Sequence, residues 1–165
     1  MSLRDRLAIS IARGQRHLPK PLLRRRHGEP PMIDGHTLDL HVHAYGSLVR
    51  AAQQRDQPTD ITPATIRAGF DTMVAIGSAP PVATVSVHDR TIPGPAGELA
   101  VRLYHPARTT GRADAIVWFH QGGGVIGNLD TDHTLCSMLA ETCQAVVVSV
   151  EYRLAPEHPF PADVV

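Results

Sequence analysis

Cysteine and long apolar runs are scarce in this 165-residue sequence. Its two cysteines, Cys136 and Cys143, stand seven positions apart on a predicted helix. That spacing separates them by about 10 Å along the helix axis, which is beyond the reach of a disulfide. We expect both to be small core residues in a reducing compartment. No apolar stretch is long enough to predict a transmembrane helix.

The N-terminal segment also lacks the pattern of a secretory signal. The apolar stretch from Leu7 to Ala12 is shorter than the apolar region of a signal peptide. It is followed by Gly14, Gln15 and Arg16 instead of a small-residue cleavage site. We therefore expect a cytoplasmic location.

Net charge is zero, but the charge is unevenly distributed. The first 27 residues hold eight lysines and arginines against a single acidic residue, Asp5. Such asymmetry permits contact with nucleic acid or an anionic membrane. No nucleic-acid-binding motif accompanies it, and solvated arginines near a chain end are the simpler interpretation. We expect neither a nucleic-acid partner nor membrane contact through the basic N-terminus.

The first 80 residues predict a helical region with a basic tail. A first helix is indicated by apolar residues at fourfold spacing (Leu3, Leu7 and Ile11), and a proline-rich mobile loop is predicted from Pro19 to Pro31. A second helix is indicated by an apolar stripe: Leu38, Val42, Tyr45, Val49 and Ala52. A third begins at Thr62-Pro63, an N-cap residue followed by proline, and ends before Pro80-Pro81.

Residues 81–165 predict an α/β region. Apolar and polar residues alternate over 83–88 and 98–103, and the turn-rich segment between them favours an antiparallel hairpin at a sheet edge. Residues 115–119 and 145–148 are continuously apolar, which is typical of strands covered on both faces. A helix between them, with its start capped near Asp130-Thr131-Asp132, predicts a right-handed parallel crossover.

A glycine-rich turn, His120-Gln121-Gly122-Gly123-Gly124, follows the first of these continuous strands. α/β proteins bind ligands where a strand ends and a helix begins. Three consecutive glycines allow positive φ and close approach of backbone N–H groups to a substrate, so two such amides could hold an oxyanion. A phosphate-binding loop is the alternative, but neither a Lys-Ser/Thr pair nor G-x-G-x-x-G spacing is present.

This turn resembles the HGGG loop of the hormone-sensitive-lipase branch of the α/β-hydrolases. The later segment from Glu151 to Ala162, EYRLAPEHPFPA, resembles a second motif of that family. The resemblance extends from about Met32 onward. It implies a partial α/β-hydrolase fold with an N-terminal helical cap over residues 1–80 and the first part of the hydrolase core over 81–165. It also implies an esterase or lipase with an acyl ester substrate and no cofactor.

The resemblance assigns roles to the turn residue by residue. Aligned without gaps, Gln121 takes the place of the family's first glycine and Gly124 that of its usual aromatic residue. The implied oxyanion donors are then the amides of Gly122 and Gly123, with His120, Gln121 and Gly124 supporting the loop. A one-residue insertion would instead align Gly122, Gly123 and Gly124 with the triplet, but it would displace the residues that follow.

The sequence contains no nucleophile elbow of the form G-x-S-x-G, which an α/β-hydrolase needs together with a later acid and histidine. Ser47, Ser78 and Ser149 are better interpreted as structural residues. We expect the chain to end before the catalytic serine and to be inactive alone, with the triad supplied by a complementing C-terminal polypeptide. The alternative is a noncatalytic remnant, an interaction module that associates through its uncovered sheet.

Histidines near the N-terminus offer a weak metal-binding pattern. On the predicted second helix His41 and His43 face different sides, so together with His36 they are better interpreted as solvated. We expect no metal site. Glu157 and His158 are expected to make structural hydrogen bonds.

Overall fold

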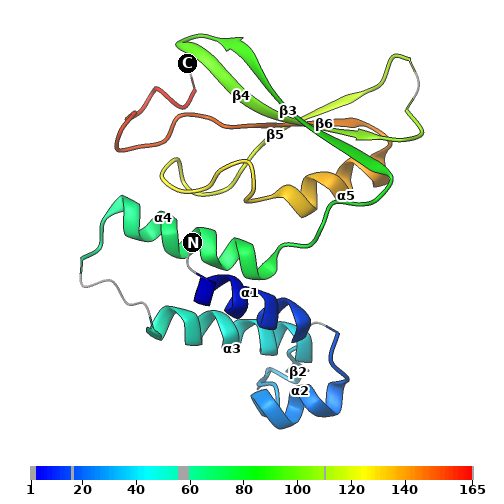
Figure 1. Ribbon diagram of the computed structural model, residues 1–165, viewed down its shortest axis with the longest axis vertical. Helices are drawn as coiled ribbons and strands as arrows, with labels where there is room; N and C mark the ends of the chain where they lie inside the picture. The colour runs from blue at the N-terminus through cyan, green and yellow to red at the C-terminus, as the bar shows by residue number, and fades with distance from the viewer. Residues whose placement is uncertain (1–2, 16, 56–59, 110, 165) are drawn as a thin grey trace. The chain divides into compact units, whose positions relative to one another are not determined.

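A computed structural model describes residues 3–15, 17–55, 60–109 and 111–164 (Figure 1). Contacts divide the chain into two compact units. Unit 1 comprises Met1–Ile61 and Thr72–Gly77, and unit 2 comprises Thr62–Asp71 and Ser78–Val165. The division into regions 1–80 and 81–165 stays a prediction.

Unit 1 is helical. It holds α1 (Leu3–Gln15), α2 (Lys20–His27), α3 (Leu40–Arg55), the last turns of α4 and a short antiparallel pair, β1 (Met32–Ile33) with β2 (His36–Thr37). The predicted loop from Pro19 to Pro31 is wrong over α2. Pro21 lies in the first turn of that helix, where its missing N–H is not needed, and the fully buried Leu23 fixes α2 against α3.

The buried face of α3 also differs from the predicted stripe. Val42 is 54% exposed, whereas Leu40 and Ala44 are buried and pack with Leu23. Leu40 is the first residue of the helix, so the stripe counted from Leu38 began before the helix does. The side chains at Leu3, Leu7 and Ala52 lie outside the described residues.

α4 (Pro63–Gly77) begins where the sequence predicted. The amide of Thr65 donates to Thr62 Oγ1 at 3.2 Å, which satisfies one of the free donors of the first turn. The first turns of this helix belong to unit 2 and its last turns to unit 1.

Unit 2 is built on a mixed four-stranded sheet with the order β3-β4-β6-β5. β3 (Val85–Gly94) and β4 (Gly97–Pro106) form the predicted edge hairpin, with only Pro95 and Ala96 between them. β5 (Ala115–Phe119) and β6 (Val146–Val150) pair in parallel, with Ala115 opposite Val146. The parallel pair is thus confirmed, and α5 (His133–Cys143) connects its strands (Figure 1).

The core of unit 2 lies between α5 and the sheet. Tyr104, Cys136, Ala140 and Val147 are fully buried there, and α5 contacts β3, β4 and β6. The prediction that β5 is covered on both faces is wrong within this chain, because Val117 and Phe119, which lie on one face of the strand, are 58% and 61% exposed.

The two cysteines have different environments. Cys136 is a core residue, but Cys143 is exposed, so the prediction of a core position holds for the first alone. Both are free thiols.

Candidate functional site

The glycine-rich loop begins directly after Phe119, at the carboxyl end of β5. Its backbone has positive φ at Gly122 (139°), Gly123 (61°), Gly124 (70°) and Gly127 (101°). A Cβ atom on Gly122 would overlap the carbonyl oxygen of Ile126, whereas one on Gly123 would meet no atom within 4 Å. Glycine is therefore required at Gly122 by space as well as by conformation.

Backbone hydrogen bonds turn the loop back on itself. The amides of Val125 and Ile126 both donate to the carbonyl oxygen of Gly122 at 3.1 Å, and the amide of Ala155 donates to that of Gly124 at 2.7 Å. Within the described part of the chain, the amides of Gly122, Gly123 and Gly124 donate to no partner. The loop thus presents three adjacent donors that the fold does not use.

His120 lies at the base of the loop and is only 3% exposed. Its ring stacks on Tyr152 with a centroid distance of 4.3 Å, and Nδ1 lies 3.0 Å from the carbonyl oxygen of Gln121. The Tyr152 hydroxyl donates to the His120 carbonyl oxygen at 2.7 Å. Burial, reinforced by the negative charge of Asp163, raises the pKa of Tyr152, so the phenol remains a neutral donor.

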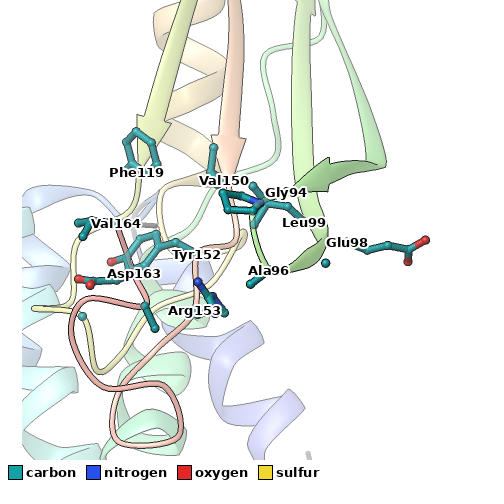
Figure 2. Close-up of a pocket in the computed structure, with 14 residues that line it drawn as sticks. Gly94, Ala96, Glu98, Leu99, Phe119, Val150, Tyr152, Arg153, Asp163 and Val164 are labelled. Atoms are coloured by element: carbon teal, nitrogen blue, oxygen red, sulfur yellow. The ribbon is translucent and has the colours of Figure 1, made fainter.

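A cavity of about 540 Å³ opens beside the loop and reaches it at Gly124. Phe119 and Val150, from the ends of β5 and β6, line it with Tyr152 and Asp163, whereas the Glu98 carboxylate points away from them (Figure 2). Its lining is mainly apolar, as in pockets that accept small organic molecules.

Acidic residues at the start of α5 act differently from the predicted caps. Asp132 is the N-cap residue but makes no side-chain capping bond; its Oδ2 accepts instead from Trp118 Nε1 at 3.0 Å. The Arg102 Nη1 donates to Asp130 Oδ1 at 2.6 Å, and the Arg102 Nε donates to Asp89 Oδ1 at 2.6 Å. These hydrogen bonds raise the pKa of Arg102 and lower that of Asp89, so the ions remain charged.

Two side chains that sequence reasoning missed, Arg67 and Asp71, reach the loop from the part of α4 that belongs to unit 2. The Arg67 Nε donates to the carbonyl oxygen of Val125 at 2.8 Å, and the Asn128 side-chain amide donates to Asp71 Oδ1 at 3.0 Å. They lie 58 and 57 residues from their partners, so no local sequence signal connects them.

Two of the serines interpreted as structural lie within regular elements. Ser47 is within α3, and Ser149 is buried in β6. Among the described residues, no group of three histidine, cysteine or acidic side chains could hold a metal ion. Of the helices formed by those residues, none has the length and apolarity needed to cross a bilayer.

Comparison with known proteins identifies the class of this fold. The family profile described as alpha/beta hydrolase fold matches residues 116–165, which contain all but the first residue of β5, the glycine-rich loop, α5 and β6. An ester-hydrolase from the metagenome of Lake Arreo has a similar structure, with a TM-score of 0.64 and 36% identity over 72% of this chain and 38% of that one. An esterase from Pyrobaculum calidifontis gives a TM-score of 0.58 and 39% identity over the same shares.

Sequence relatives narrow the class. The carboxylic ester hydrolase LipN of Mycobacterium tuberculosis is 36% identical over 83% of this chain and 36% of LipN. The esterase LipI of the same species is 49% identical over 46% of this chain and 24% of LipI. The chain belongs to the hormone-sensitive-lipase-type α/β-hydrolases, and it spans about a third or less of the length of these two relatives.

Proposed function

We propose that the protein containing this chain hydrolyses carboxylic esters, with the amides of Gly122 and Gly123 holding the oxyanion of the tetrahedral intermediate. The observation that carries the proposal is the set of unused donors in the loop at the carboxyl end of β5, in a chain whose relatives are ester hydrolases. An oxyanion at those donors would gain charge as the acyl carbon becomes tetrahedral, and donors fixed beforehand lower that barrier.

The supporting residues have distinct contacts in this proposal. His120 and Gln121 form the base of the loop, where the histidine ring is fixed between the Gln121 carbonyl and Tyr152. Gly124 lies at the cavity and is tied to Ala155. The cavity would accept one arm of an acyl ester, because most of its lining is apolar and would cover hydrocarbon.

The serine nucleophile, histidine base and acidic partner are proposed to come from outside residues 1–165, since this sequence has no G-x-S-x-G. They would lie either later in the same polypeptide or on a complementing C-terminal polypeptide. The experiments below use the gene product at its natural length, which we call the natural-length protein. If the reading frame stops at residue 165, this term includes the polypeptide encoded directly downstream.

Steady-state assays of the natural-length protein with p-nitrophenyl acetate, butyrate and decanoate test the proposal. The phosphate analogue, p-nitrophenyl phosphate, is the control because a glycine-rich loop can also hold phosphate. We expect turnover of at least one carboxylic ester and none of the phosphate. Turnover of the phosphate alone would refute the proposal, and inactivity towards every substrate would favour the noncatalytic alternative.

A further inference from the structure

One guanidinium ties three separate segments of unit 2 together. Besides its bond to Val125, Arg67 donates from Nη2 to the carbonyl oxygen of Ala155 at 2.8 Å. Both terminal nitrogens also bind the Glu157 carboxylate, at 2.7 and 2.8 Å. A helix side chain therefore holds the backbone on the far side of the glycine triplet and the backbone of the Ala155 turn at once.

These contacts close a ring around the end of the triplet. Arg67 binds the carbonyl oxygens of Val125 and Ala155, and the Ala155 amide binds the carbonyl oxygen of Gly124. Three consecutive glycines have no side chains to fix them and are conformationally permissive. A contact from outside the loop is therefore needed to hold its amides in one arrangement.

We call the contacts of Arg67 with Val125, Ala155 and Glu157 the clamp, and its chemistry requires arginine. Its planar fork presents several donors at fixed angles, so one side chain satisfies two carbonyl oxygens and a bidentate carboxylate, whereas a lysine ammonium acts as a point charge. The Arg67 hydrogen bonds lower the pKa of Glu157 to about 2. The carboxylate thus stays charged and available to the clamp at neutral pH.

Exposure indicates that this pair has a positioning role more than a stabilising one. The Glu157 side chain is 53% exposed and that of Arg67 is 27% exposed, and solvent-exposed ion pairs contribute little to folding stability. Asp71, one helical turn beyond Arg67, binds Asn128, which follows Val125 in the loop. The part of α4 in unit 2 therefore contacts the loop twice along one face.

We infer that Arg67 is a positioning residue for ester hydrolysis: it does not touch the reacting atoms, but holds Val125 and Ala155 so that the amides of Gly122 and Gly123 keep the geometry of an oxyanion site. The inference rests on the proposed function. It assigns a role in the reaction to α4, although no side chain of that helix belongs to the glycine-rich motif.

Kinetics of the natural-length protein test this role. For Arg67→Met we expect kcat with p-nitrophenyl butyrate to fall roughly ten- to a hundredfold with KM nearly unchanged, because misplacement affects the transition state more than ground-state binding. Arg67→Lys should retain an intermediate kcat. Arg108→Met, at an exposed arginine of unit 2, is the matched control and should retain full activity. A fall in Arg108→Met equal to that in Arg67→Met would overturn the inference.

Amide hydrogen exchange provides a readout independent of catalysis. Arg67→Met should accelerate exchange at the Ala155 amide, which bonds within the ring, and at the amides of Val125 and Ile126, which bond to the Gly122 carbonyl oxygen next to it. Arg108→Met should change none of these exchange rates. Unchanged exchange in Arg67→Met would overturn the inference even if esters are hydrolysed. If the wild-type protein hydrolyses no ester, the proposed function fails, and the exchange result still decides whether Arg67 holds the loop. If Arg67→Met does not fold, Arg67→Lys and Glu157→Gln replace it in both measurements.

Discussion

Alanine at Gly122 should lower activity far more than alanine at Gly123, although the two positions are adjacent. At Gly122 the new Cβ would overlap the Ile126 carbonyl oxygen and lie 2.6 Å from its carbon, so the backbone must move. That movement would break the 3.1 Å bond from the Ile126 amide and displace the Gly122 amide. At Gly123 the Cβ meets open space, and the φ of 61° is one that alanine adopts at a cost of about 1–2 kcal/mol.

The size of the expected fall in kcat depends on whether the substitution displaces an oxyanion donor. Loss of one oxyanion donor costs about 2.7–4 kcal/mol of transition-state stabilisation, or roughly a hundred- to a thousandfold in kcat, and this is the expected result for Gly122→Ala. The strain in Gly123→Ala should lower stability while kcat falls less than about tenfold. The assay is p-nitrophenyl butyrate turnover by the natural-length protein, with circular dichroism to confirm folding. Equal kcat values in the two folded variants, or the lower value in Gly123→Ala, would refute the reasoning.

Three further predictions concern stability and reactivity. Trp118→Phe removes the bond to Asp132 and should lower the free energy of unfolding by about 1–2 kcal/mol in urea titrations; no change would refute the bond's contribution. Iodoacetamide should label Cys143 in the folded protein but Cys136 only after denaturation, because burial raises the Cys136 pKa to about 11. Equal labelling of the two cysteines in the folded protein would contradict the burial of Cys136. Burial, with nearby positive charge, lowers the pKa of His27, so folding favours the neutral ring. In thermal melts the contribution of His27 to stability should be full above about pH 6.5 and fall below it. A melting temperature that does not change with pH in this range would contradict this.

The sequence predicts the sheet well where the pattern depends on local structure. Alternation over 83–88 and 98–103 identified the hairpin, and the unbroken apolar run from Ala115 to Phe119 identified a strand of a parallel pair. The glycines were expected to allow positive φ, and all three of the triplet have it. These features follow from side-chain period and from the absence of Cβ atoms, which are properties of neighbouring residues.

Features that depend on distant partners were missed. Proline-rich composition predicted a loop where α2 forms, because the burial of Leu23 against α3 outweighs local propensity. Asp132 has the residue type of a cap, but Trp118, 14 residues away, takes its carboxylate. Arg67 is an unremarkable helix residue until the fold places Val125 and Glu157 beside it.

Glycine-selective nitrogen-15 NMR of the natural-length protein tests the central claim most directly. Addition of an alkyl boronic acid, which forms a tetrahedral anion resembling the intermediate of ester hydrolysis, should move the amide protons of Gly122 and Gly123 strongly downfield as each donates to the anionic oxygen. Glycines outside the loop, such as Gly35 and Gly111, should not shift. Tight inhibition without any shift of the Gly122 and Gly123 amide protons would contradict their assignment as the oxyanion donors.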